Sequence, residues 1–568
     1  MNANTTHDDS TQLTARQMRW QSLAEVVLIV LVFFVATGDV APNVNESHYL
    51  CRLKHFWNPT WCTGDLFLDS ADTQVLFIWF FGWVTKFVSL TATAWIGRVV
   101  AWTAIAWAWQ RLSWRIVPRR FAAVLSAALF LAFNLYLHLA GEWVVGGVEA
   151  KCFAFALVLW ALREMIDRRW NWCWLLLGCA TAFHPLVGGW CGLLCAAIWL
   201  IDGRREQNLW SILPGLFSGG AIGLIGVVPA LLLTWGVPAE TVAEATRIYV
   251  FDRLPHHLAP LSMPAEEVRR RVFGHGALVL ALCALTIILR RMRATNSQQE
   301  RAPGRIPSSQ YEAYRRIALF ALGAVQIALV GFAIELALTN QPLLAAKMLR
   351  YYWFRTTDFA TAMTVALQLT ALIVLGLDAR RAWAKPLLLA SICFAGWFLG
   401  DKSWPRWPVR FPQANNEAVE TRPWPPLPQI AFPNQIPPSD KKIVDYPGWV
   451  EVCDWIATNT PPNALFVTPR LNCTFKWRTG RPEVVNRKDI PQDAAGIVEW
   501  HDRLKDIYTT QFGGVDQSVD SVGALGTDRV RELAAKYHAQ FVLSDRTQLL
   551  QLPVVYRNEE YVVYRIAN

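Results

Sequence analysis

The chain has 568 residues, of which 53% are hydrophobic and 17% are charged, and its mean hydropathy is +0.23. Soluble domains usually carry about 25% charged residues, so this composition excludes an ordinary soluble globular protein. We attribute the net charge of +10 to the loops of a membrane protein and expect no nucleic-acid partner.

Long apolar stretches fill the chain up to about residue 400. A spanning helix needs about 20 mostly apolar residues, so we expect an α-helical polytopic membrane domain at 22–400 with about eleven spans. The candidate spans are 22–39, 93–111, 121–140, 150–166, 171–184, 186–201, 211–235, 274–290, 316–337, 359–377 and 385–400. Residues 1–21 form a tail without the cleavage site of a removed signal peptide, so the first helix is expected to remain as an anchor.

Two apolar stretches differ from an ordinary span. The short neighbours 171–184 and 186–201 form either two spans or one re-entrant hairpin. The stretch 73–88 contains Lys86, and we expect it to lie flat on the membrane surface.

Lysine and arginine set the orientation, because cytoplasmic loops carry an excess of both. One set of loops is rich in arginine: Arg111, Arg115, Arg119, Arg120, Arg163, Arg168, Arg169, Arg204, Arg205, Arg290, Arg291, Arg293, Arg380 and Arg381. We therefore place these loops and the N-terminus in the cytoplasm, in a multi-pass protein of the plasma (inner) membrane. The loops expected outside are 40–92, 141–150, 236–273 and 338–358, of which one carries the conflicting run Arg269-Arg270-Arg271.

The composition changes after residue 400. Residues 401–445 are rich in Pro and Trp, which predicts a linker without a long helix. Helices and strands are expected in the rest of the chain at Trp449–Thr458, Ala464–Pro469, Asp528–Tyr537 and Phe541–Ser544, with a closing hairpin of Val554–Tyr556 and Tyr561–Arg565. This alternation predicts a small α/β domain at 446–568, and an odd number of spans places it outside the membrane.

Four of the 11 cysteines fall in outward segments, as the pairs Cys51 with Cys62 and Cys453 with Cys473. Each pair either forms a disulfide in an oxidising compartment or stays reduced. The chain has no CxxC pair and no other zinc-ligand spacing. It also has no glycine-rich phosphate loop, no GxSxG motif and no evident internal repeat.

The first outer loop contains two acidic residues, Glu46 and Asp65. Their position after the first span of a many-helix protein suggests chemistry at the membrane surface. Each also has a structural alternative. Glu46 caps or hydrates the end of the first helix, and Asp65, which follows Gly64, starts a turn.

This layout resembles the GT-C superfamily of membrane glycosyltransferases, which use polyprenyl-phosphate-linked sugars and include protein O-mannosyltransferases and lipid A aminoarabinose transferases. Those proteins have a cytoplasmic tail, one helix, an outer loop with an Asp-Glu pair ahead of a Tyr, a surface helix and a second span. The corresponding features here are Asn45-Glu46-Ser47-His48-Tyr49, the stretch 73–88 and Trp95-Ile96-Gly97-Arg98. The second acidic outer loop and the outer domain of the family correspond to 141–151 and 446–568.

One position departs from the family pattern. The Asp of the pair, usually assigned as the catalytic base, is Asn45 here, and Asn cannot accept a proton. The resemblance therefore implies that Glu46 or Asp65 is the base, or that the chain binds lipid-linked sugars without transferring them.

Transfer from a lipid phosphate also needs positive charge for the leaving group. We expect substrate binding by residues of the outer loops: Glu142, Glu149, Lys151, His256, His257, Arg350 and Arg355. Their structural alternatives are pairing between the acids and the lysine, an ordinary polar loop for the histidines, and non-specific headgroup contact for the arginines. No cofactor is identified, and a divalent metal stays open. We expect the acids and the histidines to converge on one cavity.

The sequence thus predicts a membrane glycosyltransferase that takes a sugar from a polyprenyl-phosphate carrier at the outer face, with no acceptor identified. The alternatives are a non-catalytic GT-C-like protein that binds lipid-linked sugars, a transporter or flippase, and a scaffold whose outer domain binds a partner. Transporters often show inverted repeats and midplane ionisable residues. Here no repeat is evident and the acids gather at one surface, which favours the enzyme.

Overall fold

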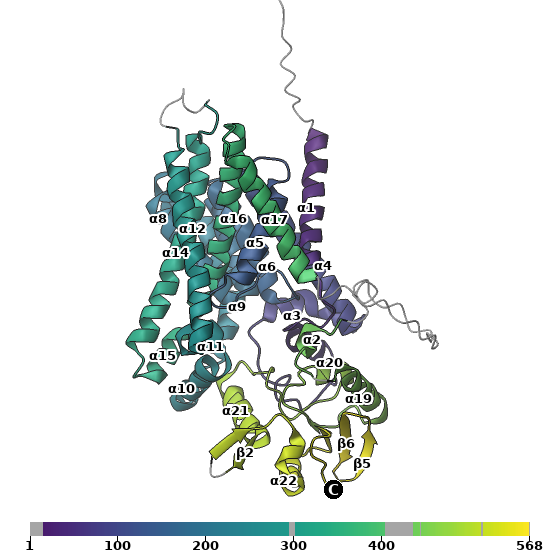
Figure 1. Ribbon diagram of the computed structural model, residues 1–568. Coiled ribbons are helices and arrows are strands. Elements are labelled where there is room, and N and C mark those ends of the chain that lie inside the picture. Colours follow the sequence, from purple (N-terminus) through teal and green to yellow (C-terminus); the bar gives the residue numbers. More distant parts are fainter. Residues whose placement is uncertain (1–14, 295–301, 404–434, 444, 513–514, 567–568) are drawn as a thin grey trace, which may run out of the picture.

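The computed structural model describes residues 15–294, 302–403, 435–443, 445–512 and 515–566. It has two parts, a bundle of long helices and a smaller domain packed at one end of that bundle (Figure 1). The smaller domain lies at the end opposite the start of the first helix, and short helices of the bundle lie between the two parts.

The bundle contains a helix at each candidate span: α1 (Ala15–Thr37), α4 (Leu90–Ile116), α5 (Ala122–Tyr136), α6 (Ala150–Ile166), α7 (Trp170–Phe183), α8 (Pro185–Ile201), α9 (Leu209–Leu232), α12 (Ala265–Arg291), α14 (Ser308–Ala337), α16 (Arg355–Asp378) and α17 (Ala384–Ser403). Among the described residues, α1, α9, α12, α14, α16 and α17 are long and apolar enough to cross a membrane. The helical membrane domain is therefore as predicted, and the number of eleven spans stays a prediction.

Helices α7 and α9 pack with their backbones in contact. A Cβ atom added to Gly178 would lie 2.0 Å from the backbone oxygen of Gly219, so only glycine permits this approach. Small residues allow such close packing where no hydrophobic force drives helices together in lipid.

Helix α8 follows α7 after His184 and begins at Pro185. The N–H that proline lacks would have no partner at a first helical position, so proline costs nothing there.

The arginine-rich loops gather at one end of the bundle. Arg119 pairs with Asp378 at the end of α16, and Arg115 lies 2.9 Å from Asp167 after α6. This is the end away from the smaller domain (Figure 1). Sharing one end is what the predicted orientation requires, since the loops of one set must lie on one side.

The conflicting arginine run lies at the other end of the bundle, on the first turns of α12. Arg270 and Arg271 both pair with Glu267, at 2.7 and 2.6 Å. Arg271 also donates to the backbone oxygen of His256 (3.1 Å). Pairing within the helix lowers the net charge of this run, which explains how it can lie opposite the other arginine-rich loops.

Short helices line the end of the bundle that faces the smaller domain: α2 (Glu46–Trp57), α3 (Val75–Phe81) with the 3₁₀ helix η1 (Gly82–Lys86), α10 (Ala239–Arg247), α11 (Pro255–Leu258) and α15 (Pro342–Leu349). Helix α3 and η1 fall within 73–88, and they expose Trp79, Phe80 and Trp83. Exposed aromatic rings suit a membrane–water interface. A position flat on the membrane stays a prediction.

Within its described residues, the smaller domain contains four α-helices and two sheets: α19 (Tyr446–Asn459), α20 (Phe475–Thr479), α21 (Ala494–Tyr508), α22 (Thr527–Tyr537), β1 (Phe466–Val467), β2 (Thr509–Phe512), β3 (Val515–Ser518), β4 (Phe541–Asp545), β5 (Val554–Arg557) and β6 (Tyr561–Arg565). The main sheet has the order β1-β4-β6-β5, with β1 parallel to β4 and the other pairs antiparallel. The α/β character and the closing hairpin are thus confirmed, whereas α21 and the β2–β3 hairpin were not foreseen.

Two further expectations concern the junction and the cysteines. Helix α17 continues to Ser403, so it includes the first residues of the stretch 401–445, and 404–434 lie outside the described residues. All 11 cysteines are free thiols, including the two outward pairs. The reduced alternative holds for both pairs in this structure.

Candidate functional site

A cavity of about 230 Å³ lies where the bundle meets the smaller domain. Its walls come from distant segments: Tyr49, Thr73, Gln74, His184, Pro185, Leu186, Ala230, Leu233, Thr234, Val242, Ala245, Thr246, Tyr249, Arg350, Tyr352, Arg355, Gln492, Ala494 and Ile497. The apolar part of the lining includes Leu186, Ala230 and Leu233. The polar part includes two arginines and three tyrosines. Such a cavity suits a ligand with an apolar chain and an anionic head.

Arg355 is the buried cation of this cavity. Its Nε lies 2.8 Å from a carboxylate oxygen of Glu142, and its Nη1 donates to Nε2 of His184 (2.9 Å). The guanidinium also lies over the ring of Tyr352, 4.0 Å from the centroid. The planar fork of arginine matches the oxygens of a phosphate, so this side chain is the natural ligand for an anion in the cavity.

The first turn of α16 fixes the loop that faces Arg355. Asp358 accepts hydrogen bonds from the backbone N–H groups of Leu139 (2.6 Å), Ala140 (3.0 Å) and Glu142 (3.0 Å). Arg355 lies one turn earlier on the same face. The backbone and the side chain of Glu142 are therefore both held by one helix end.

A chain of alternating charges continues behind Arg355. Lys151, on the first turn of α6, lies 3.2 Å from Glu142 and 3.5 Å from Glu149. Its ammonium also lies 3.8 Å from the ring centroid of Trp143. These predicted substrate-binding residues do meet, and each is buried. They form the wall directly behind Arg355.

Asn45 joins this network to the smaller domain. Its Nδ2 donates to Oε1 of Glu149 (2.7 Å), and its Oδ1 accepts from Lys488. Burial, followed by the charge of Arg253, lowers the pKa of Lys488 to about 8. The backbone oxygen of Asn45 accepts from the N–H of Tyr49 (3.1 Å), which lines the cavity. Glu149 therefore lies close behind the cavity wall formed by α2.

Glu46 occupies a different environment. Its carboxylate is fully buried and binds Nε and Nη2 of Arg98 at 2.7 and 2.5 Å. It also accepts from the N–H groups of Asn43 (2.7 Å) and Val148 (3.0 Å). A carboxylate with both oxygens engaged in this way holds two outer loops together and has no free face toward a substrate. These contacts differ from the expected structural alternative, because none of the partners belongs to α1. A role of Glu46 as base stays a prediction that this geometry does not favour.

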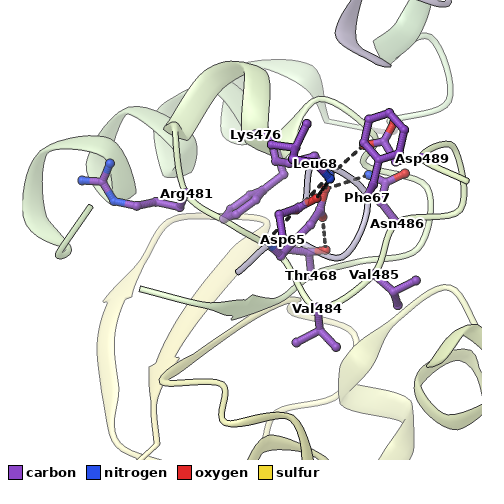
Figure 2. Close-up of polar contacts among 12 residues, drawn as sticks. Asp65, Phe67, Leu68, Thr468, Lys476, Arg481, Val484, Val485, Asn486 and Asp489 are labelled. Atoms are coloured by element: carbon purple, nitrogen blue, oxygen red, sulfur yellow. Dashed lines mark hydrogen bonds and ion pairs between the residues drawn. The ribbon is translucent and has the colours of Figure 1, made fainter. Parts of the chain in front are cut away.

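Asp65 lies in a second cluster, shown in Figure 2, at the contact between the first outer loop and the smaller domain. Lys476 lies 2.7 Å from Asp489, 2.9 Å from Glu483 and 3.2 Å from Asp65. Asp65 also accepts from the N–H of Glu483 (3.2 Å) and that of Leu68 (3.1 Å). Asp65 therefore fastens the loop to the domain, and it does not line the cavity.

The two histidines of α11 do not line the cavity either. Burial, followed by the charge of Arg253, lowers the pKa of His256 to about 4. Burial also lowers the pKa of His257 well below its usual range, and its Nδ1 bonds the backbone oxygen of Ala140. Both rings are thus neutral at pH 7, so neither supplies the positive charge for which they were predicted.

Among the nine predicted site residues, only Arg350 and Arg355 line the cavity. Glu142, Glu149 and Lys151 lie behind Arg355, whereas Glu46 and Asp65 belong to separate ion-pair groups. The expectation that the acids and the histidines converge on one cavity is therefore wrong, since none of them belongs to its described lining. Within the described parts of the chain, no group of three or more His, Cys, Asp or Glu side chains is arranged to hold a metal ion.

Sequence reasoning missed Lys488, Arg98 and the cavity tyrosines. Arg98 belongs to the Trp95–Arg98 motif, and its position on a predicted span was a signal, because a charge inside a membrane helix needs a partner. Lys488 had no such signal, since it lies in an irregular segment of the smaller domain.

Comparisons with known proteins find several similar solved structures. An oligosaccharyltransferase from Archaeoglobus fulgidus in complex with zinc and sulfate has 12% identity and a TM-score of 0.47, covering 92% of this chain and 68% of that one. AglB from the same organism, with an inhibitory peptide and a dolichol-phosphate, has 10% identity and a TM-score of 0.48, covering 94% and 70%. ArnT from Cupriavidus metallidurans, bound to undecaprenyl phosphate, has 14% identity and a TM-score of 0.39, covering 97% and 98%.

AglB and ArnT are membrane glycosyltransferases of the GT-C superfamily. This is the group that the first outer loop resembles. Because identity is low and the TM-scores are below 0.5, we base the function of this chain on its own geometry. A family model described as a domain of unknown function (DUF6798) matches residues 447–507. No curated protein matched the sequence.

Proposed function

We propose that this chain is a membrane glycosyltransferase of the GT-C type that takes a sugar from a polyprenyl-phosphate carrier. The observation that carries the proposal is the cavity at Arg355, which combines apolar lining residues with two arginines, one of them paired with Glu142. The arginine-rich end of the bundle faces the cytoplasm, so the cavity and the smaller domain face outward.

The phosphate of the donor binds Arg355, with Arg350 as a second cation. Charge-assisted hydrogen bonds from a guanidinium to phosphate are short and strong. Arg355 is largely shielded from water, where such an interaction is less screened. During transfer the bond between the sugar and the phosphate breaks, and the same guanidinium stabilises the negative charge left on the lipid phosphate.

Glu149 is the base that takes the proton of the acceptor hydroxyl. One of its oxygens accepts from Asn45 (2.7 Å), and the other forms only a long ion pair with Lys151 (3.5 Å). Burial raises the pKa of Glu149, with the charge of Lys151 opposing the shift. A carboxylate whose pKa moves toward neutrality is a better general base. Glu149 thus takes the role that Asn45 cannot perform.

A second candidate function is binding of the lipid-linked sugar without transfer. It is favoured by one observation: no Asp or Glu belongs to the described lining of the cavity. Because the proposed base Glu149 lies behind α2 and not in this lining, transfer requires the acceptor hydroxyl to reach past α2 to Glu149. Turnover by the intact protein separates these two functions.

The test uses the full chain reconstituted in lipid vesicles. Binding of undecaprenyl phosphate is measured by native mass spectrometry, and turnover is followed as release of polyprenyl phosphate from polyprenyl-phosphate sugars. Loss of a hydrogen bond to a charged group costs about 1.5–3 kcal/mol, so Arg355→Ala should weaken binding by that amount. Arg355→Lys keeps the charge that faces Glu142 but loses the fork, and it should weaken binding less.

The matched control is Arg204→Ala, an exposed arginine in the loop after α8, at the other end of the bundle. It should bind the lipid as the wild type does. If Arg355→Ala bound the lipid as tightly as the wild type does, this result would contradict a phosphate-binding site at Arg355. Binding without turnover on every polyprenyl-phosphate sugar tried would favour the second function.

A further inference from the structure

The lining of the cavity at Arg355 contains a buried polar atom without a hydrogen-bond partner. Gln74, the residue before α3, lines this cavity and is only 8% exposed. Its side-chain oxygen Oε1 is buried and accepts no hydrogen bond from any described residue. Because a buried acceptor without a partner is unfavourable, we expect this oxygen to accept a hydrogen bond from the ligand of the cavity.

The polar groups that surround Gln74 are neutral. The hydroxyl of Thr73 donates to the side-chain oxygen of Gln492 (2.6 Å), so the first outer loop and the smaller domain meet at this part of the lining. Burial keeps the pKa of Tyr49, which lies beside Gln74, well above its usual range, so its hydroxyl is uncharged at pH 7. No Asp or Glu belongs to the described lining. This part of the cavity therefore offers hydrogen bonds but no negative charge.

The two acids behind the wall are already paired with cations. Glu142 lies between Arg355 (2.8 Å) and Lys151 (3.2 Å). Glu149 forms a long ion pair with the same lysine (3.5 Å). With two arginines in the lining, the cavity as a whole is positive. A second positive charge on a ligand would find no unpaired carboxylate among these residues.

We propose that Gln74 selects an uncharged sugar, one that directs a hydroxyl group to its side-chain oxygen. The inference rests on the proposed function and adds to it the class of sugar that the polyprenyl phosphate carries. The oxygen of Gln74 requires a hydrogen-bond donor, which the carboxylate of a uronic acid lacks. A protonated amino group donates, but its charge would be buried without a carboxylate, which is unfavourable. A hydroxyl donates without carrying charge, so it meets both conditions.

The preference should already appear in donor binding, before any transfer. A site with buried polar groups discriminates against a ligand that leaves those groups unpaired. Gln74 is one such group, and its contact is made by the donor sugar alone. Binding of the donor without an acceptor is therefore the appropriate measurement.

The test measures binding of five probes to the full chain by native mass spectrometry. One probe is undecaprenyl phosphate, and the others carry glucose, glucosamine, arabinose or aminoarabinose on this phosphate. In each of the two pairs a hydroxyl is replaced by a protonated amine. The wild type should bind the uncharged member of each pair at least about tenfold more tightly (~1.4 kcal/mol). Equal or tighter binding of both amino sugars would overturn the proposal, and this comparison requires no variant.

Two variants test Gln74 itself. Gln74→Met keeps the length of the side chain but removes its amide, so it should weaken binding of the uncharged sugars and leave undecaprenyl phosphate unchanged. Gln74→Glu places a carboxylate at the same position and should shift the preference within each pair toward the amino sugar. The matched control is Gln207→Glu, at a glutamine between α8 and α9 whose Oε1 is also buried without a partner. This control should bind every probe as the wild type does.

The outcomes separate the choice of sugar from the phosphate site. Arg355→Ala should weaken binding of undecaprenyl phosphate, and unchanged binding by this variant would contradict the proposed function itself. If Arg355→Ala is impaired but Gln74→Met binds all sugar probes as the wild type does, the selection of the sugar by Gln74 is overturned alone.

Discussion

Lys151 and Lys476 each lie among buried carboxylates near the end of the bundle that faces the smaller domain, yet their surroundings differ. The three acids around Lys476 are also held by neutral donors, as in the bond from the hydroxyl of Thr468 to Glu483 (2.6 Å). Of the two acids at Lys151, Glu149 accepts from the amide of Asn45, whereas Glu142 pairs with the arginine of the cavity. Carboxylates whose oxygens are all paired within the protein stabilise the structure. Carboxylates beside a cavity that are less fully paired can still interact with a ligand or accept a proton.

The largest difference between the two clusters is expected when one carboxylate of each is replaced by its amide, which cannot accept a proton. Glu149→Gln keeps the shape of the side chain, and loss of a general base typically lowers the rate by ~10²–10⁴-fold. Asp65→Asn, the matched change in the Lys476 cluster, should leave turnover of the folded protein near the wild-type rate. Release of polyprenyl phosphate measures both. Full turnover by Glu149→Gln together with loss in Asp65→Asn would reverse the assignment.

Removal of the central cation should destabilise the Lys476 cluster. Lys476→Met leaves Asp65, Glu483 and Asp489 buried without their ammonium, and breaking such a buried group costs about 3–5 kcal/mol. Thermal unfolding followed by tryptophan fluorescence, with limited proteolysis, measures the loss. The control Lys536→Met removes an exposed lysine paired with Asp506 on the same domain and should change little. Equal stability of the two variants would contradict a structural role for Lys476.

A smaller effect is expected at Glu142, which shares Arg355 with the donor phosphate. Glu142→Gln removes the competing charge, so undecaprenyl phosphate should bind more tightly by up to about tenfold (~1.4 kcal/mol). Gln also lacks the charge that holds Lys151, so turnover should not rise with affinity. Native mass spectrometry measures the binding. Weaker binding in this variant would show that Glu142 positions Arg355 more than it competes for it.

The smallest effect concerns pH at the contact between His48 and Asp489 (3.0 Å). Burial lowers the pKa of His48, although Asp489 opposes the shift. Folded His48 is then protonated at lower pH than in the unfolded chain, where its pKa is about 6.5. The unfolded chain therefore binds more protons below about pH 6.5, and the free energy of unfolding falls as the pH is lowered.

His48→Gln should reduce this pH dependence, because the amide can bond Asp489 but does not titrate. Thermal unfolding between pH 5 and 7 measures the slope. Arg52 and Lys488 also face His48. The pKa of Lys488 is about 8, so this lysine stays charged between pH 5 and 7 and does not add to the slope. An identical slope in the variant would mean that another group is responsible.

The sequence by itself determined the helical bundle and the smaller α/β domain. These depend on local patterns: apolar stretches of about 20 residues produce helices in lipid, and alternating helices and strands produce an α/β layer. Each candidate span coincides with a helix, and the strands β4 and β6 lie where their apolar runs predict them. The outer loops that carry acids and arginines were also identified, because polar residues between apolar runs are visible without coordinates.

Only the tertiary structure decided which of these polar residues share a partner. The sequence shows that Glu46 and Glu149 are acidic. It does not show that Arg98 pairs with the carboxylate of Glu46, or that Asn45 donates a hydrogen bond to Glu149. Likewise Lys488 reaches Asn45 from a domain that is more than 400 residues away in the chain. Local pattern fixes secondary structure, whereas the burial and pairing of a charge depend on contacts between distant segments. Those contacts determine whether a carboxylate stabilises the fold or remains available for chemistry.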